Sequence, residues 1–248
     1  MRIIFMGDST MQYNDCTTYP QTGWAQEFAR FLPSGTEILN FAKNGRSTKS
    51  FIAEKRFDEV LENARAGDFA IIEFGHNDEK SEDESRFTKP FGEYKENLIF
   101  FAEKLKEKGA KPVIFSSVAR RAFDRKSHVL ATHGDYPRAA LEAALAARVP
   151  SADIDAITRR LIERTGEVNS LRFFMNFSAG LYPAYPEGKS DNTHLRSDGA
   201  HFVALTAAVS LQKICKNAAG YEELASAIFI SDEEKKFIES IFENDCQN

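Results

Sequence analysis

Four short polar segments of the chain carry residue types that hydrolytic enzymes use. They are Gly7-Asp8-Ser9-Thr10, Asn44-Gly45-Arg46-Ser47, Gly75-His76-Asn77-Asp78 and Asp191-Asn192-Thr193-His194. A serine hydroxyl becomes a useful nucleophile when a neighbouring imidazole accepts its proton, and a carboxylate can hold that imidazole in the required tautomer. The segments therefore contain the parts for nucleophilic hydrolysis of an ester.

The placement of the four segments favours a common site. The first three follow the predicted strands 3–6, 37–41 and 69–74, and the fourth lies late in the chain, just before a predicted helix. In an open parallel sheet, ligands bind beyond the carboxyl ends of the strands. We therefore expect all four segments to meet in one crevice.

Each segment alone has an ordinary structural explanation. Gly-Asp-Ser after a strand is usually a turn with a helix N-cap, and Asn44-Gly45 is a common turn dipeptide. His76-Asn77 would serve as a cap for the next segment, and Asp191 with His194 as an exposed loop pair. The order and strand-end placement of all four together favour the functional explanation.

This combination resembles the SGNH (GDSL-like) hydrolase superfamily, named for the Ser, Gly, Asn and His that its blocks contribute. By this resemblance the serine is Ser9, the glycine is Gly45 and the asparagine is Asn77. The Asp-x-x-His pair of the superfamily is Asp191 with His194. The resemblance implies a three-layer α/β/α sandwich around a five-stranded parallel sheet of flavodoxin-like order 2-1-3-4-5.

Within the superfamily, the chain is most similar to the rhamnogalacturonan acetylesterase-like group (carbohydrate esterase family 12). The features that carry this similarity are Thr10, Gly75-His76-Asn77-Asp78, Arg120-Arg121-Ala122-Phe123, and Asp191-Asn192-Thr193-His194-Leu195 followed by Gly199-Ala200. The similarity extends from Gly7 to about Ala208. Ser116-Ser117-Val118-Ala119 departs from the Thr-Pro-Val-like segment expected there, which concerns substrate contacts and not the catalytic set.

The resemblance assigns a chemical role to each catalytic residue. Histidine is largely neutral at physiological pH, so His194 can take the proton of Ser9, and Asp191 can fix the tautomer of His194. The oxyanion hole is expected to combine the backbone N–H groups of Ser9 and Gly45 with the side-chain amide of Asn77. A glycine at position 45 lets substrate approach the backbone closely.

Further polar residues are candidates for substrate binding. His76 is expected to shape the pocket, and Arg46, Arg120 and Arg121 are expected to meet an anionic sugar. For His133, in the loop before a predicted helix, a binding role and a capping role both remain open.

No metal or cofactor is expected. His201 lies seven residues after His194, a spacing that lacks the ligand pattern of a zinc motif, so we expect an ordinary helix histidine.

The elements that must position these residues follow from hydrophobic patterning. Apolar runs at 3–6, 37–41, 69–74 and 112–118, with a weaker one at 149–154, predict strands of a parallel sheet covered on both faces. Predicted helices cover residues 23–31, 94–108, 136–147, 155–165, 199–216 and 232–244. The chain shows no internal repeat and no Gly/Ser-rich linker, so we expect a single domain over residues 1–248.

Composition excludes several classes of function. The formal net charge of −5 argues against a nucleic-acid partner, and no run approaches the roughly 20 apolar residues of a membrane span. The start is too abrupt for a signal peptide, and Cys16, Cys215 and Cys246 are too scattered for a disulfide framework. These observations predict a cytoplasmic protein; they leave its oligomeric state open.

The leading hypothesis is an O-acetylesterase that acts through an acetyl-enzyme intermediate on Ser9. Because polymers do not cross membranes, a cytoplasmic enzyme should meet acetylated sugars or short pectin- or xylan-derived oligosaccharides. A lipase, thioesterase or arylesterase of the same superfamily is one alternative, and a non-catalytic carbohydrate-binding protein on this scaffold is another. A flavodoxin-like nucleotide-binding protein is disfavoured, because neither G-x-G-x-x-G nor a Walker A motif follows any strand.

Overall fold

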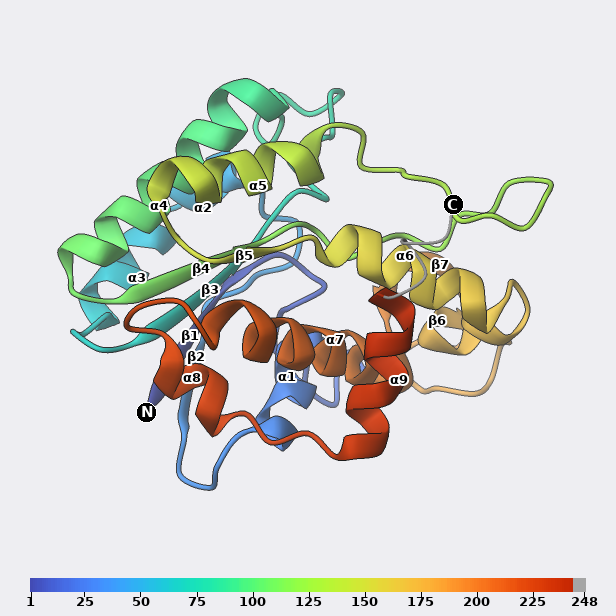
Figure 1. Ribbon diagram of the computed structural model, residues 1–248. Helices are drawn as coiled ribbons and strands as arrows, with labels where there is room; N and C mark the ends of the chain where they lie inside the picture. Colours follow the sequence, from blue (N-terminus) through green and yellow to red (C-terminus); the bar gives the residue numbers. More distant parts are fainter. Residues whose placement is uncertain (243–248) are drawn as a thin grey trace.

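A five-stranded parallel sheet forms the centre of the computed structural model, which describes residues 1–242. The strands are β1 (Arg2–Gly7), β2 (Glu37–Asn40), β3 (Phe69–Glu73), β4 (Lys111–Phe115) and β5 (Ser151–Ala152). Their spatial order is β2-β1-β3-β4-β5, and helices lie on both sides of the sheet (Figure 1). The predicted fold class and strand order are therefore confirmed.

Two apolar cores lie on opposite faces of the sheet. Successive side chains of a strand point to opposite faces, so Ile3 and Phe5 enter one core and Ile4 and Met6 the other. The first core is closed by α1 (Trp24–Phe28), α6 (Ile154–Thr165), α7 (Ser197–Cys215), α8 (Glu222–Ala227) and α9 (Asp232–Phe242). The second is closed by α2 (Thr48–Ala53), α3 (Arg56–Asn63), α4 (Lys95–Glu107) and α5 (Tyr136–Ala147). No helix within residues 1–242 is long and apolar enough to cross a membrane.

Several element boundaries differ from the predicted ones. The fourth strand ends at Phe115, because the next two serine side chains turn to polar partners: Ser116 donates to Asp153 at 2.8 Å and Ser117 to the carbonyl of Phe74 at 2.8 Å. The fifth strand is only Ser151–Ala152, pairing with the last two residues of β4. The last predicted helix is α9, and residues 243–244 of that prediction lie outside the described residues. Helices α2, α3 and α8 were not anticipated.

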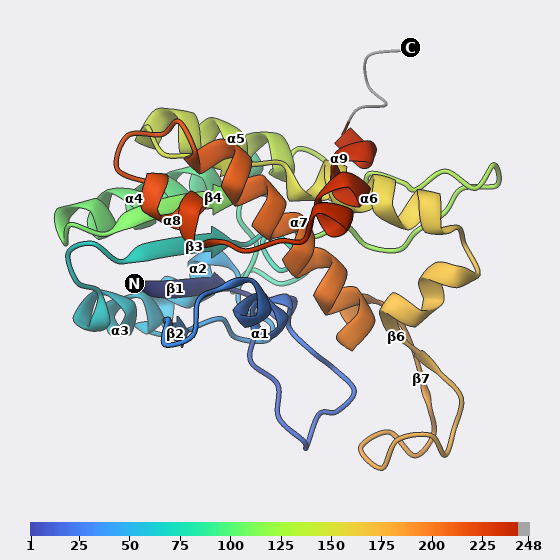
Figure 2. The ribbon, with the colours of Figure 1, turned by 60° about the horizontal axis from the view of Figure 1, so that its bottom comes forward.

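A hairpin outside the main sheet carries the fourth polar segment. Strands β6 (Phe174–Phe177) and β7 (Lys189–Leu195) pair antiparallel, and the hairpin projects from the body beside the segment that follows β1 (Figure 2). The Tyr185 hydroxyl donates to the carbonyl of Thr18 at 3.3 Å, and the rings of Tyr19 and Tyr182 pack with centroids 5.5 Å apart. These contacts hold the end of the hairpin against the segment after β1.

Helix α7 follows the hairpin and packs tightly at Gly199. A Cβ atom there would lie 2.1 Å from the carbonyl oxygen of Phe173. Alanine normally stabilises a helix relative to glycine, by about 1 kcal/mol. We nevertheless expect Gly199→Ala to destabilise the protein by about 1–3 kcal/mol, a fall in Tm of roughly 5 °C, because the backbone must move. Thermal unfolding measures the change. Asp198→Ala at the exposed neighbouring position is the control, and equal Tm values for the two variants would contradict the prediction.

Candidate active site

A cavity of about 500 Å³ opens beyond the carboxyl ends of β1, β2 and β3. Its lining consists of Ser9, Asn44, Gly45, His76, Asn77, Lys80, Arg120, Asp191, Thr193 and His194. All four polar segments recognised in the sequence contribute to this lining. Two predicted substrate-binding residues, Arg46 and Arg121, do not line it.

The turn after β1 places Ser9 in the cavity wall. The carbonyl of Asp8 accepts from the backbone N–H groups of Met11 at 3.3 Å and Gln12 at 3.1 Å. The carboxylate of Asp8 accepts from both the backbone N–H and the hydroxyl of Thr10, each at 3.0 Å. The turn is therefore fixed on both sides of Ser9, whose side chain is only slightly exposed.

A buried carboxylate, Glu73, lies beneath this turn. It is fully buried and accepts from Trp24 Nε1 at 2.8 Å and from the Val118 backbone N–H at 3.2 Å, and both its oxygens lie 3.2 Å from the Thr10 hydroxyl oxygen. Burial, together with the neighbouring charge of Asp8, raises the pKa of Glu73 to about 8. Burial also raises the pKa of Asp8. Glu73 is therefore largely protonated at neutral pH.

The hydrogen-bond partners of the Thr10 hydroxyl also require a proton on one of the two carboxyl groups. The Thr10 hydroxyl faces a carboxylate oxygen of Asp8 at 3.0 Å and both oxygens of Glu73 at 3.2 Å. A hydroxyl has one hydrogen to donate, so it satisfies only one acceptor and must receive a hydrogen bond from the other. A proton on Glu73 supplies that bond, and the Asp8–Thr10–Glu73 cluster then holds one shared proton.

Asp8 and Glu73, together with His76, are the group within residues 1–242 that has the spacing of metal ligands. Potential ligand atoms of Asp8, Glu73 and His76 all lie within 4.8 Å of one another. Both oxygens of Glu73, however, already accept hydrogen bonds from protein donors. The carboxylate is thus arranged to receive protons and N–H groups, so we assign the cluster a structural role.

Asp191 and His194 form a hydrogen-bonded pair. His194 Nδ1 lies 2.7 Å from Asp191 Oδ2, and the backbone N–H groups of Thr193 and His194 donate to Asp191 Oδ1 at 2.8 and 3.0 Å. Burial raises the pKa of Asp191, but the hydrogen bonds and charge of His194 outweigh it and hold the pKa well below its usual range. An ionised Asp191 keeps the proton of neutral His194 on Nδ1 and leaves Nε2 able to accept another.

Ser9 and His194 both line the cavity. Among the residues that the structure describes, these two side chains make no direct hydrogen bond to each other. In unliganded active sites such contacts are often long and tighten when substrate binds. The arrangement is thus compatible with proton transfer from Ser9 to Nε2 of His194.

Arg121 holds the segment that carries the Asp191–His194 pair. Its backbone N–H donates to the carbonyl of Asn192 at 2.9 Å, and its guanidinium contacts the Asn192 side chain at 3.3 Å and Ser170 at 3.1 Å. A further bond runs to the carbonyl of Glu167. Arg121 therefore ties β7 to the segment after β4 and does not face the cavity.

Gly45 and Asn77 lie where an oxyanion hole is expected. Gly45 has φ +74°, a conformation that favours glycine. Asn77 is buried; its Nδ2 donates to the carbonyl of Arg46 at 3.1 Å, and its Oδ1 lies 3.5 Å from Arg86 Nη1. These contacts fix the amide while leaving the second hydrogen of Nδ2 for a ligand. Arg86, itself paired with Asp83, was not among the predicted site residues.

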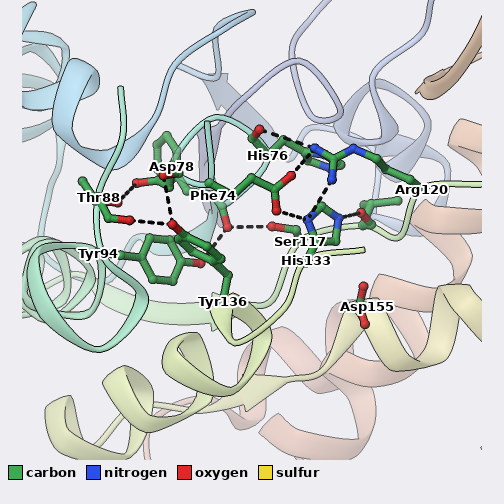
Figure 3. Close-up of polar contacts among 12 residues, drawn as sticks. Phe74, His76, Asp78, Thr88, Tyr94, Ser117, Arg120, His133, Tyr136 and Asp155 are labelled. Carbon is green, nitrogen blue, oxygen red and sulfur yellow. Dashed lines mark hydrogen bonds and ion pairs between the residues drawn. The ribbon is translucent and has the colours of Figure 1, made fainter. Parts of the chain in front are cut away.

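The remaining predicted arginines are engaged by protein carboxylates. Arg46 pairs with Glu54 at 2.9 Å, so its contribution to the site is the backbone carbonyl that holds Asn77. Arg120 lines the cavity but forms an ion pair with Glu79, which also contacts His133 Nδ1 at 3.0 Å (Figure 3).

His76 and Lys80 complete the cavity wall. His76 is buried, and burial together with the charges of His133 and Arg120 lowers its pKa well below the usual range, so it is neutral. Lys80 makes no hydrogen bond or ion pair through its ammonium group with any residue in 1–242. It was missed from the sequence because it lies in an acidic stretch that looks like a solvated loop.

Two other histidines lie outside this cavity. His133 is buried beside it, with Nε2 3.0 Å from the carbonyl of Val118. His201 packs on α7 against Phe31, with ring centroids 5.7 Å apart. Cys16 and Cys215 are free thiols, and Cys246 lies outside the described residues.

A match to the GDSL-like Lipase/Acylhydrolase family extends over residues 5–208. The chain belongs to this family. It is 38% identical over 216 residues to the rhamnogalacturonan acetylesterase RhgT of Bacillus subtilis, and the aligned region covers 86% of this chain and 90% of the relative. It is 30% identical over 213 residues to the probable rhamnogalacturonan acetylesterase YesY of the same organism, covering 86% and 93%.

Solved structures share the fold of this chain. The protein YxiM of Bacillus subtilis aligns with a TM-score of 0.74 and 21% identity over 88% of this chain, which spans only 57% of the YxiM chain. A variant of an acetyl xylan esterase from Geobacillus stearothermophilus aligns with a TM-score of 0.59 and 13% identity, covering 93% and 97% of the two chains. Family and relatives together confirm the predicted class, a carboxylic ester hydrolase with the SGNH fold.

The buried proton on Glu73 makes stability depend on pH. Its pKa of about 8 in the folded protein lies above the ordinary glutamate value of 4.5, so between these two pH values folding takes up a proton and stability falls as pH rises. Glu73→Gln needs no such proton. We expect the variant to be less stable than the wild-type protein at pH 5, and this difference to shrink towards pH 8. Urea unfolding across this range measures it.

Glu62→Gln, at an exposed position, is the matched control and should differ from the wild-type protein by a constant amount. A stability difference for Glu73→Gln that is the same at every pH would show that Glu73 is ionised in the folded protein.

Proposed function

We propose that this chain is a serine-dependent carbohydrate O-acetylesterase. The observation that carries the proposal is a single cavity lined by Ser9, by the hydrogen-bonded Asp191–His194 pair, and by Gly45 and Asn77. A nucleophile, a base with its orienting carboxylate, and donors for an oxyanion are the parts that acyl transfer requires. A non-catalytic binding protein would have no need of this complete set.

The reaction proceeds in two steps. Ser9 Oγ attacks the acetyl carbonyl carbon while its proton passes to His194 Nε2, and the sugar hydroxyl leaves with that proton. Water then attacks the acetyl-enzyme, with His194 again as base, and acetate is released. The backbone N–H groups of Ser9 and Gly45 and the Asn77 amide donate to the oxyanion of each tetrahedral intermediate.

The polar lining favours a small acyl group on a sugar. No lining residue carries a long apolar side chain, so the hydrocarbon of a fatty acyl ester would have no surface to pack against. A lipase is therefore the weaker candidate. The names of the two curated relatives, both rhamnogalacturonan acetylesterases, and of the acetyl xylan esterase neighbour point to acetylated plant polysaccharide as the source of substrate.

We further propose that the preferred substrates are acetylated sugars or short pectin- or xylan-derived oligosaccharides that carry a uronate. Lys80 supplies the cation for its carboxylate, because the guanidinium groups of Arg46, Arg120 and Arg121 are engaged by other protein groups. Cytoplasmic action, predicted from the sequence, stays a prediction.

The chain is proposed to form one domain. Both apolar cores are built on the same sheet, and the catalytic segments come from residues 7 to 194.

The assignment of the nucleophile predicts the behaviour of Ser9→Ala. This variant should lose fluorophosphonate labelling and release no acetate from an acetylated sugar, while its circular dichroism and Tm stay close to those of the wild-type protein. Ser81→Ala, at an exposed serine of a nearby loop, is the control and should label normally. Labelling that persists in Ser9→Ala would move the nucleophile to another residue.

The assignment of Lys80 predicts a change in substrate preference. Lys80→Ala should lower kcat/KM for acetylated uronates relative to matched neutral sugars by roughly 10- to 100-fold, since a hydrogen bond to a charged group contributes roughly 1.5–3 kcal/mol. Acetate release from paired substrates measures the ratio. Lys43→Ala, an exposed lysine outside the cavity lining, should leave the ratio unchanged. An unchanged ratio in Lys80→Ala would remove Lys80 from substrate recognition.

A further inference from the structure

Asp78, the residue after Asn77, carries a carboxylate that the proposed reaction does not use. It is fully buried and lies outside the lining of the catalytic cavity. Its Oδ1 accepts from the Thr48 hydroxyl at 2.5 Å, from the Thr48 backbone N–H at 3.0 Å and from the Thr88 hydroxyl at 2.8 Å, the last of which Figure 3 shows. The carboxylate therefore joins the segment after β3 to the first residue of α2 and to the loop before α4.

The donors around Asp78 favour the ionised carboxylate. The Thr48 hydroxyl accepts from Nδ2 of Asn97 at 3.0 Å, so its own hydrogen is directed to Asp78. The Thr48 backbone N–H and the Thr88 hydroxyl donate to the same carboxylate. Burial raises the pKa of Asp78 to about 7, and the hydrogen bonds from Thr48 and Thr88 oppose that rise. At pH 8 the carboxylate is therefore mostly ionised and accepts charge-assisted hydrogen bonds.

Two links connect the segments that carry the proposed oxyanion-hole donors. Asn77 Nδ2 donates to the carbonyl of Arg46 at 3.1 Å, and Asp78 binds Thr48 two residues further along. Gly45 directly precedes Arg46, so the links hold the Gly45 backbone beside the Asn77 side chain. The first link uses the Asn77 amide itself, which must also meet the oxyanion. The second link, through Asp78, holds the two segments together without occupying that amide.

The segment that carries Asp78 is itself held in place. The backbone carbonyl of Asp78 accepts from the Thr88 backbone N–H at 3.0 Å and lies 3.1 Å from the Tyr136 hydroxyl (Figure 3). At the start of the same segment, the carbonyl of Phe74 accepts from the Ser117 hydroxyl at 2.8 Å (Figure 3). The carboxylate therefore presents a fixed point to which the first residue of α2 binds.

We propose that Asp78 is a positioning residue, which aligns the backbone N–H of Gly45 with the side-chain amide of Asn77. This role rests on the proposed function, because the aligned groups are the donors to the oxyanion. It goes beyond that function, since the Asp78 side chain does not reach the cavity. Oxyanion donors act through a preorganised geometry, so their displacement slows the chemical step more than it weakens substrate binding.

Asp78→Asn tests the alignment, because it keeps the size of the side chain and removes the charge that strengthens its hydrogen bonds. We expect kcat for acetate release at pH 8 to fall about tenfold with KM little changed, a part of the roughly 10²–10³ that loss of an oxyanion donor costs. In an Asn77→Ala background the same change should cost no more than about threefold, because one of the two aligned donors is gone. Thr48→Val removes the hydroxyl bond from the other end and should show the same division between kcat and KM even if Asp78→Asn does not fold.

Asp68→Asn is the matched control. Asp68 is a buried aspartate just before β3, at the opposite end of the strand, and its carboxylate accepts from the Arg65 backbone N–H at 2.8 Å. This variant should lower Tm and keep the wild-type kcat.

The possible failures are distinguishable. A wild-type protein that releases no acetate from any acetylated sugar would refute the proposed function. With an active wild-type protein, an unchanged kcat in folded Asp78→Asn or in Thr48→Val would refute the alignment alone. So would a loss expressed mainly in KM, or a loss by Asp78→Asn that is equally large with and without Asn77.

Discussion

The position of Ser9, the proposed nucleophile, depends on one buried carboxylate. Glu73, at the end of β3, accepts from the indole of Trp24 in α1 and from the backbone of Val118 after β4, and it shares a hydrogen bond with the hydroxyl of Thr10 beside Ser9. Three separate parts of the chain thus meet at one side chain in the sheet interior. Buried polar groups that are fully hydrogen-bonded fix a unique arrangement, because every alternative leaves a group without a partner.

The proposed base, His194, is positioned near Ser9 in a different way. Asp191 and His194 lie on a hairpin outside the main sheet, so the sheet does not fix their position. Arg121 binds β7 to the segment after β4, and contacts of Tyr182 and Tyr185 bind the hairpin end to the segment after β1. The site is therefore assembled from a rigid sheet edge and a hairpin held to it by side chains.

These two routes explain what the sequence could and could not predict. The strands before Ser9 and Asn77 are buried on both faces and appear as plain apolar runs, so the sheet and its polar ends were predictable. Strand β7 reads Lys-Ser-Asp-Asn-Thr-His-Leu, has almost no apolar face and gave no strand signal, so the hairpin was missed. The pair on it was recognised as a polar segment before a predicted helix, and its role as base and orienting carboxylate came from the resemblance to a known family.

Arginine roles were the least predictable part of the site. A sequence shows that Arg46, Arg120 and Arg121 carry charge, but not which partner each long side chain reaches across the fold. In the structure all three are engaged by protein groups, while Lys80, within the acidic stretch 78–84, lines the cavity and Arg86, just after that stretch, contacts Asn77. Side-chain direction depends on tertiary packing, which local pattern does not encode.

The protonation of the buried cluster bears directly on catalysis. In the proposed reaction, negative charge develops on the substrate carbonyl oxygen in the transition state, close to Ser9. If Asp8 and Glu73 were both ionised beneath that residue, two negative charges at low dielectric would oppose it. Burial raises the pKa of both carboxyls, and the shared proton removes one of the two charges at neutral pH. Asp191, whose pKa is lowered, lies on the far side of the His194 ring from Nε2, and in the proposed reaction its negative charge stabilises the imidazolium that forms as Ser9 loses its proton. The fold thus supplies buried acceptors to hold the turn rigid, while keeping their charge low where the oxyanion forms.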